Sequence, residues 1–144
     1  MKSSPQVGDV HTFSFRIGDN KIVPALYPES DIFTSMPAVF ATGFMVGLME
    51  WACVEHLRPH LEEGEGSLGV AIDVSHSAPT LPGQTVTVIV TCDLAEGRRL
   101  GWHVVARDEL DVIGQGRHER AVVMWDRFAR KLEEKRTRLA GPAP

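Results

Sequence analysis

A carboxylate stands in the middle of the most apolar segment of this chain. Glu50 lies within VFATGFMVGLMEWACVEHL, residues 39–57, which would be apolar on nearly every side of a helix. Taking a charged group out of water costs several kcal/mol unless the group is paired or hydrogen-bonded. Because such a cost is usually tolerated for a reason, Glu50 is a candidate catalytic carboxylate.

Thr42 and Glu50 would share one face of that helix. Together with Val46 they are spaced i, i+4 and i+8, a spacing that aligns side chains along a helix. At 1.5 Å per residue the hydroxyl and the carboxylate would lie roughly 12 Å apart along the axis. They would not touch within one chain, but a substrate lying along the helix could contact both, and the site could draw groups from two subunits.

His76 ends an alternating stretch, SLGVAIDVSH. The residues that share its parity are mostly apolar: Leu68, Val70, Ile72 and Val74. We therefore expect this face to lie against the helix, with His76 pointing inward at the strand's end. Histidine titrates near neutral pH, so His76 and Glu50 together could supply a general base and a nucleophile or second base.

Each of these residues also has a purely structural interpretation. Thr42 could bond back to a carbonyl one turn earlier, Glu50 could lie at the surface of the helix, and His76 could be a satisfied core histidine.

His118, in RHERAV, is interpreted as a polar strand end. No histidine or cysteine pair has the spacing of a metal site, and no phosphate-binding loop or nucleophile elbow is present, so no metal or cofactor is expected.

Composition restricts the function classes. The 144 residues, 43% hydrophobic and 24% charged, fit a single domain spanning 1–144. A net charge of -4 gives no basic field for nucleic acid. The longest uncharged apolar run, 37–49, is too short to span a bilayer. With Cys53 and Cys92 interpreted as buried free thiols, we expect a soluble, cytoplasmic protein.

The hydrophobic period changes along the chain and predicts the elements. Alternation predicts a strand at 11–17, and a 3.6-residue period predicts a helix from about Pro37, capped by Ser35, to Leu57 or Leu61. Four strands should follow, within 67–78, 84–94, 98–109 and 111–125. An amphipathic helix over 126–139 should end the domain, with 137–144 expected to form a flexible tail.

This β-α-β-β-β-β order indicates an α+β protein. A helix apolar on nearly every face must be enclosed, and an antiparallel sheet wrapped around it produces the hotdog arrangement. A sheet of this size rarely covers such a helix completely. We therefore expect a homodimer, which could associate further.

Several segments carry a family resemblance over nearly the whole chain. LYPES, FATGFMVGLMEWACV, GEGSLG, VSHSA, EGRRL and GRHERAVV resemble the fluoroacetyl-CoA thioesterase family, which has the hotdog fold. The resemblance implies hydrolysis of an acyl-CoA to a carboxylate and free CoA, without a cofactor. It also implies that Thr42, Glu50 and His76 are the catalytic residues.

The resemblance further implies substrate-binding residues. Gly69 matches a family glycine whose N–H could meet the developing oxyanion, and Arg120 matches an arginine near the acyl pocket. The family's fluoroacetyl-specific enzyme has an apolar lid with two phenylalanines. Phe33 matches the first, but Met36 replaces the second, so the resemblance leaves strict fluoroacetyl selectivity open.

Three functions therefore remain in view. The leading one is a thioesterase for fluoroacetyl-CoA or a close analogue. The others are a housekeeping hotdog thioesterase for a different small acyl group and a non-catalytic module that binds acyl-CoA. A hotdog hydratase is a fourth option, but the short Asp and His motif typical of that class is not evident.

Overall fold

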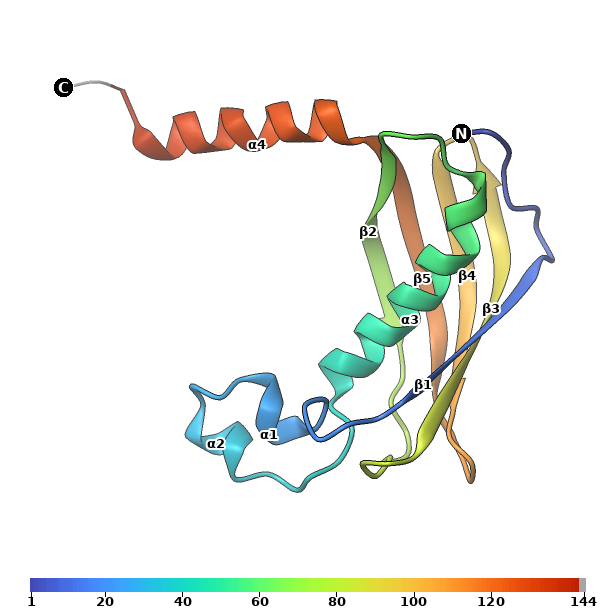
Figure 1. The fold of residues 1–144 in the computed structure, drawn as a ribbon, viewed down its shortest axis with the longest axis vertical. Helices are drawn as coiled ribbons and strands as arrows, with labels where there is room; N and C mark the ends of the chain where they lie inside the picture. The colour runs from blue at the N-terminus through green and yellow to red at the C-terminus, as the bar shows by residue number, and fades with distance from the viewer. Residues whose placement is uncertain (143–144) are drawn as a thin grey trace.

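Five antiparallel strands curve around one long helix in this computed structural model, which describes residues 1–142 (Figure 1). The predicted element order is confirmed. The elements are β1 (Val10–Arg16), α1 (Val23–Leu26), α2 (Asp31–Thr34), α3 (Thr42–Leu57), a 3-10 turn (Arg58–His60), β2 (Glu65–Val74), β3 (Thr85–Glu96), β4 (Arg99–Arg107), β5 (Val112–Met124) and α4 (Trp125–Ala140).

The strands are ordered β1-β3-β4-β5-β2. This order leaves β1 and β2 as the two edges of the sheet within the described part of the chain. The turn between β3 and β4 contains Gly97, whose φ of 61° lies in the left-handed region that glycine adopts at no steric cost. The edge strand β2 pairs with β5 through Gly69 opposite Arg120, and a bulge between Gly69 and Ala71 shifts the register.

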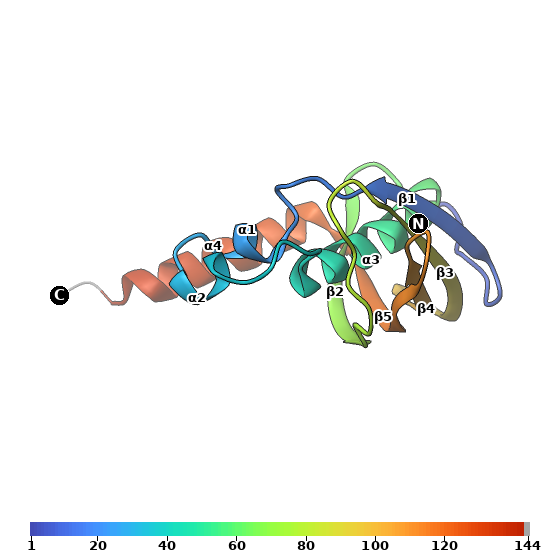
Figure 2. The same cartoon turned by 90° about the horizontal axis from the view of Figure 1, so that it is seen from below.

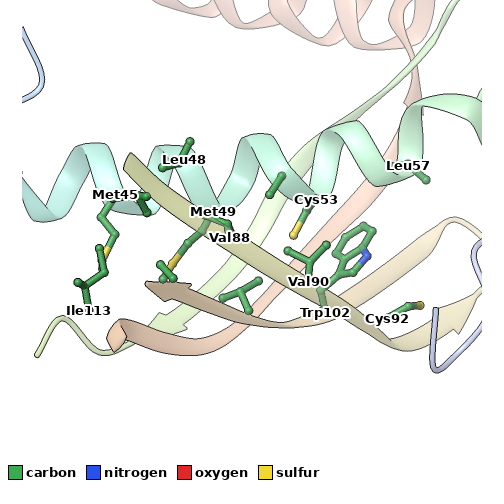
Figure 3. Packing of buried hydrophobic residues seen from close by; sticks show 14 of the residues in the cluster. Met45, Leu48, Met49, Cys53, Leu57, Val88, Val90, Cys92, Trp102 and Ile113 are labelled. Atoms are coloured by element: carbon green, nitrogen blue, oxygen red, sulfur yellow. The ribbon is translucent and has the colours of Figure 1, made fainter. Parts of the chain in front are cut away.

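The core lies between α3 and the concave face of the sheet (Figure 3). Met45, Met49 and Cys53 of α3 are fully buried, and they share this core with Val90 and Trp102 from β3 and β4. The β3 strand alternates between buried and partly exposed residues over most of its length, as a half-buried strand should. The helix and the sheet therefore bury each other's apolar faces.

The central helix begins later than predicted. Residues 37–41 are not helical, and Ala41 is extended, with φ −74° and ψ 140°. Its N–H donates to the carbonyl of Lys21, and Phe40 forms an isolated bridge with Ile22. Ser35 closes the short helix α2 and does not cap α3. The helix thus starts at Thr42 because the preceding segment is tied to the chain beside β1.

The predicted inward face of β2 is wrong over the second half of the strand. Val70 and Ile72 are 50% and 43% exposed. A bulge between Gly69 and Ala71 shifts the register there, and residues 69–73 are exposed on both faces of the strand. Because β2 is also an edge strand, these apolar side chains lie at an open side of the molecule.

One chain does not enclose its central helix. Trp51 on α3 is 42% exposed, and α4 extends away from the sheet beyond β2 (Figures 1 and 2). Since α4 continues to Ala140, the expected tail at 137–144 overlaps its last turn; residues 143–144 lie outside the described part. Neither α3 nor any other helix within residues 1–142 is long and apolar enough to cross a membrane.

Candidate active site

Thr42 and His76 meet at the N-terminal end of the central helix. Thr42 is the first residue of α3, and His76 follows β2 by two residues. The Thr42 Oγ1 and His76 Nδ1 atoms are 2.7 Å apart, a hydrogen-bond distance. The other ring nitrogen, Nε2, is buried and has no hydrogen-bond partner within residues 1–142. The ring therefore pairs one nitrogen with Thr42 and leaves the other without a partner in the described part of the chain.

A hollow of about 320 Å³ opens beside this pair. Its walls are mostly apolar, with the hydroxyl and the imidazole as polar groups; the lining residues are Val23, Val39, Phe40, Thr42, His76, Ser77, Ala78 and Pro79. Apolar walls with a few placed polar groups are typical of small-molecule sites. This hollow could hold a small acyl group next to groups that transfer protons.

The two expected lid residues do not line this hollow. Phe33 lies on α2, where its ring is 6.0 Å from the ring of Tyr27. Met36 follows α2 and is 40% exposed. Within a single chain, Phe33 and Met36 are thus not among the residues that line the hollow beside Thr42 and His76.

Glu50 is held by a buried cation. Its Oε1 atom accepts a hydrogen bond from Arg120 Nη1 at 3.1 Å, and the Arg120 side chain is only 8% exposed. Arg120 is fixed in turn by Ser67, through its hydroxyl at 2.8 Å and its carbonyl at 3.0 Å. The Glu50 side chain remains 41% exposed, so one carboxylate is both paired with a buried charge and open to a ligand.

His118 is a site residue that sequence reasoning missed. Its side chain is 2% exposed, and its Nε2 atom lies 3.9 Å from Glu50 Oε1. Its Nδ1 must donate to the Ala71 carbonyl at 2.8 Å, so Nε2 is the acceptor for Arg120 Nη1 at 3.0 Å. Burial and then the Arg120 charge lower the pKa of His118, which agrees with a neutral ring. His118 and Arg120 are two residues apart on one strand, so their side chains lie on the same face. This spacing was the signal in the sequence that could have identified His118.

Gly69 makes room for the carboxylate. A Cβ atom at this position would lie 2.7 Å from Glu50 Oε1 and 3.2 Å from His118 Cε1. Any side chain there would therefore displace Glu50 or its neighbours. The glycine, Glu50, Arg120 and His118 form one group, which we call the carboxylate cluster.

The predicted catalytic residues thus fall into two groups in one chain. Thr42 and His76 are in contact, whereas Glu50 belongs to the carboxylate cluster, two helical turns further along α3. The axial distance between Thr42 and Glu50 is roughly 12 Å at 1.5 Å per residue. One chain therefore does not bring the three predicted residues into contact.

Burial of the His76 ring lowers its pKa below the ordinary value of 6.5. The imidazole is therefore neutral at pH 7. A neutral ring can accept a proton at one nitrogen while the other donates a hydrogen bond. No three His, Cys, Asp or Glu side chains in the described residues are grouped closely enough to hold a metal ion.

Comparisons with known proteins agree with this architecture. A model of the family described as fluoroacetyl-CoA-specific thioesterase matches residues 26–126. A fluoroacetyl-CoA thioesterase of Streptantibioticus cattleyicolor is 54% identical over 135 residues, which cover 94% of this chain and 97% of that protein. The residues that the family model matches span positions 42, 50 and 76.

Solved structures share the fold as well. A crystal structure of the fluoroacetyl-CoA thioesterase FlK superposes with a TM-score of 0.90 and 53% identity, covering 92% of this chain and 98% of the other. A Thermus thermophilus protein described as a thioesterase superfamily member gives a TM-score of 0.86 at 29% identity, covering 99% and 100%. The predicted hotdog arrangement is thereby confirmed.

Proposed function

The chain belongs to the fluoroacetyl-CoA-specific thioesterase family, and from this premise we propose that it hydrolyses fluoroacetyl-CoA or a closely related short acyl-CoA. The products are the carboxylate and free CoA. The observation that carries the proposal is Glu50, a half-exposed carboxylate held by buried Arg120 on a helix that also presents the Thr42–His76 pair. A module that only binds acyl-CoA has no need for such a group.

The three residues have separable roles in this proposal. Glu50 either attacks the thioester carbonyl carbon, or takes a proton from a water molecule whose oxygen attacks it. The carbon–sulfur bond then breaks and the departing thiolate takes up a proton. If Glu50 is the nucleophile, this step leaves an acyl anhydride on Glu50, which a water molecule hydrolyses to release the carboxylate and regenerate Glu50. His76 handles that proton, and Thr42 orients the imidazole through its hydroxyl. The N–H of Gly69 is proposed to stabilise the oxyanion, while Arg120 holds Glu50 in place and lines the acyl end of the site.

The working unit is proposed to be a homodimer in the cytoplasm. The open edge of β2 carries exposed Val70 and Ile72, and exposed Trp51 lies on the helix that the sheet leaves partly uncovered. Pairing of two β2 edges would cover Val70 and Ile72 and bring the Thr42–His76 pair of one copy toward the carboxylate cluster of the other. Two buried free cysteines, Cys53 and Cys92, agree with a reducing compartment.

A direct test measures thiol release from a panel of acyl-CoAs that includes acetyl-, fluoroacetyl-, propionyl- and butyryl-CoA. We expect turnover of the two-carbon substrates, with fluoroacetyl-CoA giving the highest kcat/KM. Preference for a longer acyl group would support the housekeeping thioesterase instead. Absence of thiol release from every member, with binding retained, would identify a non-catalytic module.

The pH dependence should follow His76. Because burial lowers its pKa below 6.5, the neutral ring persists into mildly acidic solution, and protonation removes it only at lower pH. We expect the acid limb of kcat/KM to lie below pH 6.5, measured with a buffer series from pH 4.5 to 8 at constant ionic strength. An acid limb at or above pH 6.5 would contradict a buried, neutral imidazole.

Gly69→Ala should reduce activity through Glu50. The added Cβ would lie 2.7 Å from Glu50 Oε1, so the carboxylate must move, and misplacing a catalytic group by about 1 Å can cost ~100-fold in rate. We expect a loss of at least ~10-fold in kcat with the fold retained. Gly47→Ala is the matched control, because a Cβ there meets nothing within 4 Å. Equal effects of the two substitutions would separate Gly69 from catalysis.

Met36→Phe tests selectivity. A pocket distinguishes small apolar differences by only ~1–3 kcal/mol, so the acyl group must also be held firmly and shielded from water. Met is flexible where Phe is a rigid plate. We expect the substitution to raise the ratio of kcat/KM for fluoroacetyl-CoA over acetyl-CoA. An unchanged ratio would mean that residue 36 does not set selectivity.

A further inference from the structure

The C-terminal helix α4 stands away from its own chain. All residues of α4 after Phe128 are exposed, yet the helix is amphipathic: Trp125, Phe128, Leu132 and Leu139 lie on one face. Leu132 is 41% exposed and Leu139 is 79% exposed. An isolated helix of this length is only marginally stable in water, so the apolar face of α4 requires a partner surface.

The charge of α4 indicates what that surface is like. The helix carries six basic residues and only three acidic ones, whereas the rest of the chain has nine basic and sixteen acidic residues. An acidic, partly apolar surface of another copy of this chain would complement it. The chain's own sheet does not provide such a surface for α4, which leaves the body at the start of β2.

A surface of this kind exists on the segment that contains α1 and α2. Between residues 22 and 40 the chain has two acidic residues, Glu29 and Asp31, and no basic one. The same segment exposes three large apolar side chains: Tyr27 at 60%, Ile32 at 65% and Met36 at 40%. It thus combines apolar groups and negative charge, the complement of α4.

Helix α4 and the α1–α2 segment lie at opposite ends of β2 and project beyond the same edge of the sheet (Figures 1 and 2). Trp125 N–H donates to the Gly64 carbonyl at 2.9 Å, which fixes α4 at the beginning of β2. The other end of β2 leads to His76 and the start of α3, where Gly43 contacts Leu26 of α1. A second copy that paired antiparallel on β2 through a two-fold axis would exchange these ends.

We propose that, in the dimer, α4 of each subunit packs its apolar face on the α1–α2 segment of its partner. The inference rests on the proposed homodimer and goes beyond it, because it assigns a role to an element that the catalytic site does not use. At 1.5 Å per residue α4 is about 24 Å long, enough to reach across an interface. The basic side chains of α4 then lie near Glu29 and Asp31, and its leucines cover Ile32 and the neighbourhood of Met36. The partner's α4 thereby packs against and stabilises the segment that carries Phe33 and Met36.

Cross-linking of two differently tagged, co-expressed chains tests this arrangement. One chain carries Ile32→Cys and the other carries Leu132→Cys; the control pair replaces Leu132→Cys by Glu134→Cys, which lies at nearly the same height on the opposite face of α4. The native cysteines are buried, and the wild-type chain measures their background. With a short bismaleimide we expect the first pair to give several-fold more covalent heterodimer than the control.

The outcomes distinguish failure of the proposed α4 contact from failure of the proposed homodimer or of the proposed thioesterase function. Sedimentation of each mixture reports the dimer, and thiol release reports catalysis. Dimeric, active protein with equal cross-linking of both pairs would overturn the α4 contact while leaving the proposed function intact. Binding of wild-type protein to anionic phospholipid vesicles, lost in Leu132→Asp and accompanied by no preferential cross-link, would overturn it in favour of a membrane-surface helix.

Discussion

Replacing Glu50 by Gln is expected to lower kcat by at least ~100-fold. Gln keeps the shape of the side chain but has neither the charge nor the basicity needed to attack a carbonyl or to activate water. Arg120 would lose its carboxylate partner, yet it would keep its hydrogen bonds to Ser67 and His118. The fold should therefore survive, and thiol release from fluoroacetyl-CoA measures the loss.

The matched control is Glu55→Gln on the same helix. Glu55 is hydrogen-bonded to Trp51 and Arg58 at the surface, remote from the carboxylate cluster, so we expect near wild-type turnover. Unfolding curves for both variants should be similar to wild type. If Glu50→Gln retained a tenth or more of wild-type kcat with unchanged substrate binding, Glu50 would be neither nucleophile nor base.

Loss of His76 should be comparably severe. His76→Ala removes the only imidazole in contact with Thr42 within the described residues. Because Nε2 of this ring has no partner in the described residues, the substitution breaks one hydrogen bond and leaves a small space beside Thr42. We attribute the expected effect to lost proton transfer, and kcat should fall while the melting temperature changes little.

The sequence predicted the architecture because hydrophobic period and element type agree. Alternation over β1 and β3 and the long apolar run of α3 correspond to faces that are partly buried in β1 and buried in β3 and α3. Glu50 could be singled out for the same reason: a carboxylate among buried apolar neighbours requires a partner. That partner is Arg120. The resemblance placed this residue near the acyl pocket, but it did not predict the ion pair with Glu50.

Other features depend on long-range contacts that local patterns do not contain. The start of α3 is set by the bridge between Ile22 and Phe40, not by Pro37. The exposure of β2 between Gly69 and Asp73 follows from its place at the edge of the sheet. His118 was interpreted as a polar strand end because its neighbours in sequence are charged, although its neighbours in space bury it. In each case tertiary pairing decided the outcome.

Complementation between inactive chains is expected to restore activity, because the two halves of the proposed site lie apart in one chain. A mixture of His76→Ala and Glu50→Gln chains, co-expressed at equal levels, contains half heterodimers if assembly is random. In each heterodimer one site receives both mutations and the other receives neither. We expect about a quarter of wild-type activity per chain, whereas either variant alone should be nearly inactive.

A second mixture reverses the logic and serves as its control. Wild-type chains mixed with His76→Ala/Glu50→Gln double-mutant chains should retain about a quarter of the activity if sites are shared between subunits, but about half if each chain has its own site. Sharing of sites between subunits therefore raises the activity of the first mixture and lowers that of the second, relative to sites within one chain. No recovery in the first and one half in the second would place the Thr42–His76 pair and Glu50 in a single subunit, and α3 would then have to present both to one extended substrate.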